Sequence, residues 1–433
     1  MFKRPSDKKI LWLLGVIGFI SLLIGGLMLL NDGWPLAAES TLLNAPLRYP
    51  YATQTTAVTP ILALEQEIAF YQERLTHDPN SGLNLAALAG AYFNMAKLSG
   101  GMNWYLLAEQ AAHRSLASLP FNNEGAMLVL AQIASDKHRF NDALTWVDAI
   151  LKQQPGHEDA RALQVTVLLA QGEYAQANRQ SAELAAQLPT SSVLFLHALS
   201  LVALGEEQKA LDAFERALGL EEPGDAQTSA WMRTLLGRFY THRGHADVAQ
   251  MLFEEALRIV PHYPLALIQL AELHAQQNQF AEAQDAYEQV LRITQSNKSA
   301  QLFDHSVFRG LARLKAAQGD AASADAWWTK AETVLREHVD LSFGHRRELA
   351  QLLLERGQPQ DVDEALALMK EEIEIRRDAD TLATYAWALS EAGQWREAHT
   401  VMEELLAKGT QDPRYQERME QIAQNLKDNA ADS

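Results

Sequence analysis

The chain of 433 residues contains no cysteine. Disulfides, cysteine-ligated zinc sites, iron–sulfur clusters and cysteine nucleophiles are therefore excluded. Proline and glycine are scarce as well, with 14 and 23 residues, which excludes collagen-like and proline-rich architectures. Hydrophobic residues make up 48% and charged residues 21%, a globular balance that excludes a mainly disordered chain. The lack of cysteine leaves the compartment open, because such a chain is stable in either redox environment.

Positive charge is also in short supply. Lys and Arg number 37 against 55 Asp and Glu, so the net charge is −18. A nucleic-acid-binding protein needs a basic footprint, so we expect no nucleic-acid partner. The charge is uneven, because residues 1–60 carry +2 and the rest of the chain carries −20.

Residues 10–30 contain no charge and only one clearly polar residue, Ser21. At about 1.5 Å per residue, a helix of this length spans one hydrocarbon core, so we predict a transmembrane helix. The alternative is a cleaved signal peptide, whose apolar region is usually about 7–15 residues long. Leu36-Ala37-Ala38 would then be a loose cleavage site. The greater length of the run favours an uncleaved anchor.

The flanks of this run set its orientation. Lys3, Arg4, Lys8 and Lys9 precede it, whereas Arg48 is the single basic residue among the thirty that follow. The positive-inside rule places residues 1–9 in the cytoplasm and the rest of the chain outside, which in a bacterium is the periplasm. We therefore predict a single-pass inner-membrane protein. Residues 31–60 are rich in Pro and Thr and are predicted to form a semi-extended tether.

From residue 61 the chain is predicted to be helical throughout, because apolar residues recur at spacings of three and four. Nine alanines recur at separations of 33 to 41 residues, and we place each at the start of the second helix of a repeating unit. They are Ala108, Ala143, Ala177, Ala210, Ala249, Ala283, Ala324, Ala365 and Ala398. A glycine stands five residues before several of them, where a left-handed residue would end the first helix. These glycines are Gly172, Gly205, Gly244, Gly319 and Gly393.

Small and bulky residues also recur at fixed places in the units. The first helix carries a small residue at Ala89, Ala131, Ala198, Gly237, Ala271, Ala312, Ala350 and Ala386. The second helix carries a bulky one at Phe214, Phe253, Tyr287 and Trp328. Small residues suit places where helices approach closely, and large ones fill the gap between neighbouring units.

This pattern resembles the tetratricopeptide repeat (TPR), a helix–turn–helix unit of roughly 34 residues. The resemblance implies an all-α, right-handed superhelical solenoid of about nine repeats over residues 61–427. Residues 61–78 and 414–427 are expected to be capping helices, and residues 428–433 a disordered tail. Residues 98–104 are expected to lengthen the first turn, and residues 219–230 and 294–306 to form long links between units.

No motif for chemistry is present. The chain lacks a phosphate-binding glycine-rich loop, a Gly-x-Ser-x-Gly elbow and a His-Glu-x-x-His helix. We therefore predict no catalytic, cofactor-binding or metal-binding residues and do not expect an enzyme. His242 and His245 are expected to form an exposed pair in a turn. His338 and His345, seven residues apart, are expected to face solvent.

The resemblance implies a concave surface, lined by first helices, on which a partner peptide lies. Ala162, Thr166, Phe195 and Leu199 stand where a chaperone-tail clamp of the family has Lys and Asn, which disfavours such a clamp. The candidate groove residues are Phe195, Leu199, Trp231, Arg238, His242, Arg309, Arg313 and Arg347. In one interpretation the arginines bind an acidic or C-terminal carboxylate segment of a partner. In the other, which we favour, they pair with acidic neighbours such as Glu272 and Glu348.

The leading functional hypothesis is a membrane-anchored periplasmic scaffold that holds a protein partner during envelope assembly, secretion or maturation. In layout it is similar to the anchored TPR proteins of cytochrome c maturation. The alternative is a constitutive structural subunit of a larger inner-membrane complex, in which residues 98–104 and 219–230 would be buried contacts. Repeats alone do not identify a pathway.

Overall fold

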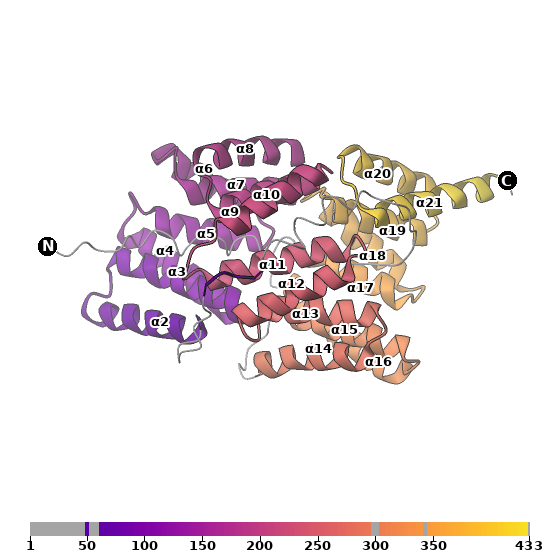
Figure 1. Cartoon of the computed structure of the whole chain (residues 1–433), viewed down its shortest axis with the longest axis horizontal. Helices are drawn as coiled ribbons and strands as arrows, with labels where there is room; N and C mark the ends of the chain where they lie inside the picture. The colour runs from indigo at the N-terminus through magenta and orange to yellow at the C-terminus, as the bar shows by residue number, and fades with distance from the viewer. Residues whose placement is uncertain (1–47, 52–59, 296–302, 341–343, 432–433) are drawn as a thin grey trace.

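The computed structural model describes residues 48–51, 60–295, 303–340 and 344–431. Within these residues the chain forms twenty α-helices and no β-strand, which confirms the all-α prediction. Eighteen helices form nine consecutive pairs, numbered here as units 1 to 9 (Figure 1). The pairs are α3 (Gly82–Ser99) with α4 (Met102–Ser118), α5 (Glu124–Asp136) with α6 (Phe140–Gln153), α7 (Glu158–Gln171) with α8 (Tyr174–Gln187), α9 (Ser191–Ala203) with α10 (Glu207–Gly219), α11 (Ala226–Thr241) with α12 (Ala246–Ile259), α13 (Pro264–Gln276) with α14 (Phe280–Gln295), α15 (Asp304–Ala317) with α16 (Ala321–Asp340), α17 (Arg346–Arg356) with α18 (Asp361–Glu372), and α19 (Ala379–Glu391) with α20 (Trp395–Ala407).

The repeated small residues lie where the two helices of a unit touch. Each of the nine recurring alanines lies in a second helix and is at most 4% exposed. Gly237 of α11 shows why size matters, because a β-carbon there would overlap the ring of Phe253 on α12. A larger residue at such a place would push the helices apart and open the core.

The turns inside the units follow the glycine pattern, with one exception. Gly172, Gly205, Gly244, Gly319 and Gly393 all have positive φ, between 72° and 81°, as a left-handed helix end requires. The predicted long turn at residues 98–104 is wrong. Helix α3 continues to Ser99 and α4 begins at Met102, so only Gly100 and Gly101 connect them. The left-handed Gly100 donates its N–H to the carbonyl of Ala96 and ends α3 two residues later than expected.

A helix flanks the nine units at each end. Helix α2 (Pro60–His77) precedes them, and α21 (Pro413–Ala431) follows and buries Tyr415 and Ile422. The predicted disordered tail is partly helical, since α21 continues to Ala431. The predicted transmembrane segment, residues 10–30, lies outside the described residues, as do residues 1–9. Of the helices that are described, none is long and apolar enough to cross a membrane.

The solenoid closes on itself, and the C-terminal helices return to the edge of units 3 to 5 (Figure 1). The N–H of Arg377 donates to the carbonyl of Gln171 at 3.2 Å. The hydroxyl of Thr410 donates to the carbonyl of Ala203 at 2.7 Å. We call this junction the seam: the turns of units 3 to 5 on one side, and the links that follow α18 and α20 on the other.

Part of the predicted tether packs on the solenoid. Residues 48–51 lie against α12 and the link of residues 220–225 between α10 and α11. Tyr49 is 5% exposed and belongs to the hydrophobic core. The tether therefore has a fixed point on unit 5.

Candidate binding site at the seam

The predicted groove residues lie on first helices, except His242 in the turn after α11, but they do not share one environment. Phe195 of α9 and Trp231 of α11 are 0% and 2% exposed. Their ring centroids are 5.2 Å apart, inside the core between units 4 and 5. They do not line an open surface, because large aromatic side chains fill the space between neighbouring first helices.

Three of the predicted arginines make ion pairs between units. Arg309 holds Glu355 with two hydrogen bonds of 2.6 and 2.7 Å, and Arg313 contacts Glu272 at 3.1 Å. Burial alone would raise the pKa of Glu355, but Arg309 and Arg313 hold it below its ordinary value. These contacts match the interpretation in which the arginines pair with acidic neighbours.

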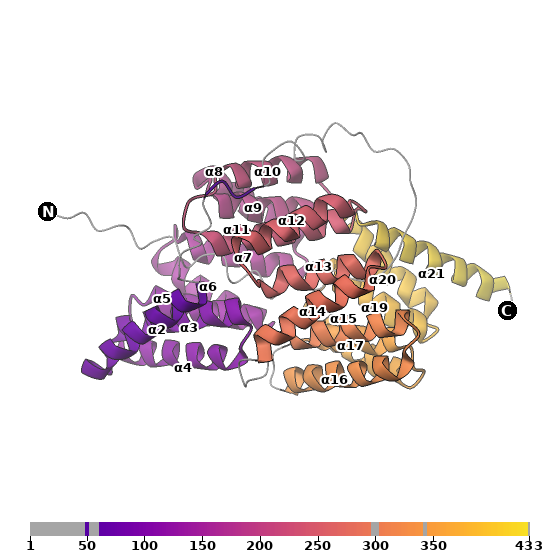
Figure 2. The ribbon, with the colours of Figure 1, turned by 60° about the horizontal axis from the view of Figure 1, so that its bottom comes forward.

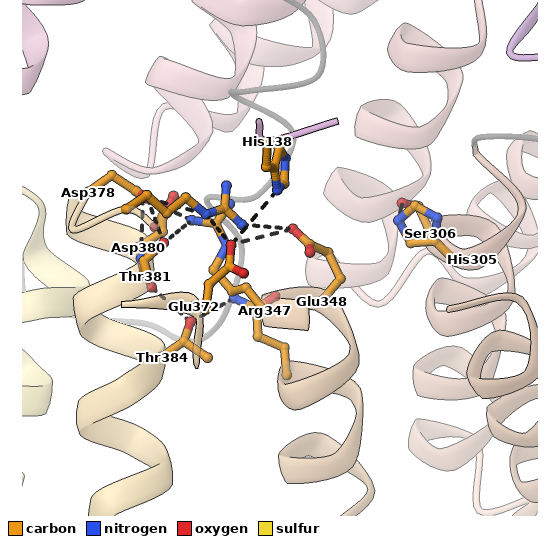
Figure 3. A network of polar contacts seen from close by, with 12 residues as sticks. His138, His305, Ser306, Arg347, Glu348, Glu372, Asp378, Asp380, Thr381 and Thr384 are labelled. Carbon is orange, nitrogen blue, oxygen red and sulfur yellow. Dashed lines mark hydrogen bonds and ion pairs between the residues drawn. The ribbon is translucent and has the colours of Figure 1, made fainter. Parts of the chain in front are cut away.

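Arg347 is the most deeply buried of the three and belongs to a larger polar network (Figure 3). Its guanidinium contacts Asp378 at 2.9 Å and Glu348 at 3.6 Å. The same network contains Arg376, which contacts Glu372 at 2.5 Å. Glu372 in turn lies 3.8 Å from His138, in the turn of unit 2. Buried charges of both signs therefore join units 8 and 9, and Glu372 lies beside the turn of unit 2.

A cavity of about 150 Å³ lies at the seam. Three of the predicted residues, Leu199, Arg238 and His242, line it together. Apolar side chains of α7, α9, α10 and α11 form most of one wall, and the polar residues that precede α19 and α21 form the other. The lining comprises Thr166, Leu169, Tyr174, Leu199, Val202, Ala203, Phe214, Leu235, Arg238, Phe239, His242, Arg243, Asp378, Ala379, Asp380, Thr410, Gln411, Asp412 and Tyr415.

The charged groups of the cavity wall are strongly affected by burial. Burial lowers the pKa of Arg238 to about 10, so the guanidinium stays cationic at neutral pH. Burial raises the pKa of Asp380 to about 7, although Arg347 and Arg414 oppose the shift. The hydroxyl of Tyr415 donates to Asp380 at 2.7 Å. The cavity thus has an apolar wall, a buried cation in Arg238 and a carboxyl group in Asp380 whose pKa is close to neutral pH.

His242 is not part of an exposed pair. Its side chain is 12% exposed and lies 3.6 Å from Asp412, with a nitrogen of Arg414 at 3.2 Å. Burial lowers its pKa well below the ordinary value, and Arg414 lowers it further. His242 is therefore neutral at pH 7 and closes the cavity at the start of α21.

The expectation that His338 and His345 face solvent is wrong. They are 0% and 9% exposed, and their Nδ1 atoms lie 3.2 Å apart. The rings of His305 and His138 have centroids 4.9 and 6.1 Å from that of His345. His345, directly before α17, adopts a left-handed φ of 65°, and its ring is buried. No three His, Asp or Glu side chains in the described part of the chain have the geometry to hold a metal ion.

Sequence reasoning missed the residues that the C-terminal units bring to the cavity. Asp378, Asp380 and Tyr415 lie more than 130 residues from the α11 side chains that they face. A repeat pattern identifies neighbours within a unit and between adjacent units, but not contacts across the closed solenoid. Tyr174 directly follows the Gly172–Glu173 turn, and nothing in the sequence around it predicts its contact with Ala379.

Three family models match parts of the chain. Two described as tetratricopeptide repeat match residues 227–296 and 353–422, and one described as anaphase-promoting complex, cyclosome, subunit 3 matches residues 136–217. The chain contains tetratricopeptide repeats. The two TPR matches fall on units 5 and 6 and on units 8 and 9, where the helix pairs and buried alanines also lie.

Known proteins are similar to parts of this chain. Cellulose synthase operon protein C of Pseudomonas fluorescens is 25% identical over 231 residues, which are 49% of this chain and 18% of the relative. The chain therefore spans less than a fifth of that relative. Human IFIT1 dimer with m7Gppp-AAAA aligns at 16% identity and a TM-score of 0.49, over 81% of this chain and 78% of that one. The APC/C hetero-tetramer Cut9–Hcn1 aligns at 12% identity and a TM-score of 0.46, over 83% and 59%.

Proposed function

We propose that this TPR protein is a non-catalytic scaffold, anchored in the inner membrane, whose solenoid lies in the periplasm. It holds a partner protein during assembly, secretion or maturation in the cell envelope. Its predicted layout, an anchor followed by a TPR solenoid, is similar to that of the anchored TPR proteins of cytochrome c maturation. Two features support this proposal. The TPR fold is typical of interaction scaffolds, and residues 10–30 with their basic flank are typical of an anchor.

The observation that carries the proposal is the seam cavity. Its volume of about 150 Å³ is close to that of an apolar protein cavity that admits a benzene ring. Leu199, Leu235 and Phe239 would contact an apolar side chain, and the cationic residue Arg238 lines the same cavity. An arginine forms two parallel hydrogen bonds with a carboxylate. The proposed ligand is therefore the C-terminal residue of a partner, with a large apolar side chain and a free carboxylate.

Two variants test the cavity. Leu199→Trp would fill the cavity, and Arg238→Gln would remove its cation while keeping a polar side chain. Arg216→Gln, at an exposed position on α10, is the matched control. The full-length proteins are tagged, cross-linked in cells and purified in mild detergent, and the captured proteins are identified by mass spectrometry.

Both cavity variants are expected to lose the same captured proteins, which wild type and Arg216→Gln keep. Far-UV circular dichroism melting curves must first show that each variant is folded. Retention of every captured protein by both folded variants would contradict the cavity as the binding site.

The membrane part of the proposal needs its own test. Spheroplasts are treated with protease, and the mature protein is sequenced from its N-terminus. A scaffold with a periplasmic solenoid is digested in intact spheroplasts and begins near Met1. A mature protein that begins after Ala38 would show cleavage of a signal peptide, and a protected solenoid would place it in the cytoplasm.

The second candidate is a constitutive subunit of a larger membrane complex. Exposed apolar side chains on and beside unit 1 favour it, because Leu83 and Phe121 are 71% and 77% exposed. The two loops first expected to make such contacts, residues 98–104 and 219–230, are only partly available. Residues 98–102 are buried and Asn103 is exposed. The second link contacts Tyr51 through the carbonyl of Glu221, while Leu220 stays 46% exposed. Stoichiometric co-purification favours the subunit, and cross-link-dependent capture favours the scaffold.

A further inference from the structure

A short segment near the start of the described chain packs onto unit 5. Residues 48–51, Arg-Tyr-Pro-Tyr, lie beside α11 and the link that precedes it (Figures 1 and 2). Helix α2, which follows this segment after only eight residues, lies elsewhere, packed on α3 of unit 1. The segment is therefore held by unit 5 and not by its neighbours in sequence.

Both main-chain polar groups of Tyr49, its N–H and its carbonyl, form hydrogen bonds with side chains of α12. Its N–H donates to Oε1 of Glu255 at 2.7 Å, and its carbonyl accepts from Arg258 at 3.3 Å. Glu255 and Arg258 are themselves paired at 2.6 Å, one turn apart on α12. A buried main-chain group without a partner is costly, so this pair of side chains makes burial of the segment favourable.

The two tyrosine side chains point to the same side, as alternate residues of an extended chain do. The hydroxyl of Tyr51 donates to the carbonyl of Glu221 at 2.9 Å, and that of Tyr49 to the carbonyl of Glu222 at 3.3 Å. Their rings meet edge to face, with centroids 5.3 Å apart. Pro50 between them restricts the backbone and has no N–H to satisfy.

The link that accepts these hydroxyls is itself held in place. Glu221 receives two hydrogen bonds from Arg233 of α11, at 2.6 and 2.9 Å, and Arg233 is 0% exposed. The guanidinium of Arg233 also lies 5.9 Å from the centre of the Tyr49 ring. The surface is thus held by buried contacts and offers specific partners for main chain, hydroxyl groups and an aromatic ring.

We propose that unit 5 is a docking site for an extended tyrosine-containing segment, and that residues 48–51 of the same chain occupy it. The docking fixes the point at which the predicted membrane tether meets the solenoid. This consequence for the membrane rests on the proposed anchoring, whereas the docking itself does not.

The docking reduces the largest distance that the solenoid can lie from the membrane, and it determines which side of the solenoid faces the membrane. Seventeen residues separate the predicted transmembrane segment from Arg48, a span of at most about 60 Å when fully extended. Without docking, the free tether would extend to Pro60, and 29 residues would span at most about 100 Å. Docking therefore holds unit 5, in the middle of the solenoid, close to the bilayer.

Hydrogen exchange of full-length protein in mild detergent tests the docking. In wild type the amide of Tyr49 is expected to exchange at least about tenfold more slowly than in an unstructured peptide. Glu255→Ala removes its acceptor and is expected to abolish this protection. Glu254→Ala, at the exposed neighbouring position on α12, is the control and should preserve it. An unprotected Tyr49 amide in wild type, or equal exchange in both variants, would overturn the proposal.

The membrane consequence has a separate readout. Because the chain has no cysteine, Met251→Cys on α12 or Glu420→Cys on α21 gives a single site for a nitroxide label. In nanodiscs that contain a nickel-chelating lipid, the label at residue 251 should relax faster than the label at residue 420. Tyr49→Ala with Tyr51→Ala should remove this difference. If Tyr49 is protected but the chain does not fractionate with membranes, the docking stands and the proposed anchoring fails.

Discussion

The hydroxyl of Tyr174 accepts a hydrogen bond of 2.7 Å from the N–H of Ala379, across 205 residues of sequence. Tyr174 begins the second helix of unit 3, and Ala379 begins the first helix of unit 9. Both residues are buried, at 7% and 4% exposure. This bond joins the two sides of the seam and lies at the edge of the cavity.

Tyr174→Phe tests the contribution of this bond. The substitution leaves the buried N–H of Ala379 without its acceptor, so we expect a loss of about 1–3 kcal/mol in the free energy of unfolding. Tyr385→Phe, at a partly exposed position on α19, is the control and should cost less than about 0.5 kcal/mol. Urea unfolding followed by circular dichroism measures both. Equal losses in the two variants would show that the hydrogen bond between Tyr174 and Ala379 adds nothing measurable to the free energy of unfolding.

Gly237 and Gly219 offer a matched pair of glycine-to-alanine substitutions within helices. At Gly237 the added methyl group meets the ring of Phe253, so we expect a loss of about 1–3 kcal/mol. At Gly219, near the end of α10, the methyl group meets no atom, so we expect no loss or a gain of up to about 1 kcal/mol. Thermal unfolding of the two variants gives the comparison. A stabilising Gly237→Ala would contradict the close packing of α11 on α12.

Arg347→Met tests the buried charge network. The substitution leaves Asp378 without its main cationic partner, so we expect a loss of about 3–5 kcal/mol. Adding Asp378→Asn should recover part of this loss, because an uncharged amide then replaces the carboxylate and its oxygen can still cap α19. Arg292→Met removes an exposed pair with Asp285 and should cost less than about 1 kcal/mol. Strict additivity of the two substitutions in the double variant would argue against the pairing.

The buried histidines predict a loss of stability in acid. Burial lowers the pKa of His338 to about 4 and that of His345 well below its ordinary value. The unfolded chain binds these protons near pH 6.5, whereas the folded chain does not. The stability is therefore fully present above pH 6.5 and falls as the pH drops, by about 2 kcal/mol for His338 between pH 6.5 and pH 5.

His338→Gln is expected to reduce this difference in stability between pH 7 and pH 5. His113→Gln, at an exposed position on α4, should leave the difference unchanged. Urea unfolding curves at the two pH values provide the measurement. Identical pH dependence in wild type and His338→Gln would show that His338 titrates as an exposed histidine does.

Asp380 predicts a pH dependence of the opposite sign. Its pKa is raised by burial to about 7, so its contribution is fully present below about pH 4 and is lost as the pH rises to 7. Asp380→Asn removes the ionisation and keeps an oxygen for the Tyr415 hydroxyl. The variant is therefore expected to be more stable than wild type at pH 8, with a smaller gain at pH 5. A destabilised variant at pH 8 would contradict the shift.

The repeating part of the fold could be predicted because its cause is local. Each alanine from Ala108 to Ala398 lies where two helices of one unit touch, so its spacing reports the unit length directly. The closure could not be predicted in this way. It depends on small rotations between units that accumulate from Tyr174 to Ala379, and no single residue encodes their sum.

The site was predicted only in part for the same reason. Leu199 and Arg238, and His242 directly after α11, were found because positions on and at the end of first helices recur with the repeat. The histidine cluster was missed because His345 leaves the helical pattern with a left-handed φ, which non-glycine residues seldom adopt. The role of Tyr49 was missed because Tyr49 and Tyr51 lie in a proline-rich segment outside the repeats, where no repeat spacing marks a position as buried.

Repeat proteins usually tolerate the gain or loss of a unit, because each unit contacts only its neighbours. Closure removes that freedom here. Tyr174 can reach Ala379 only if the number of intervening helices, and their total rotation, stays as it is. Duplication or deletion of one unit between them would therefore break both the seam and the cavity. The number of units in this solenoid is thus fixed by its closure.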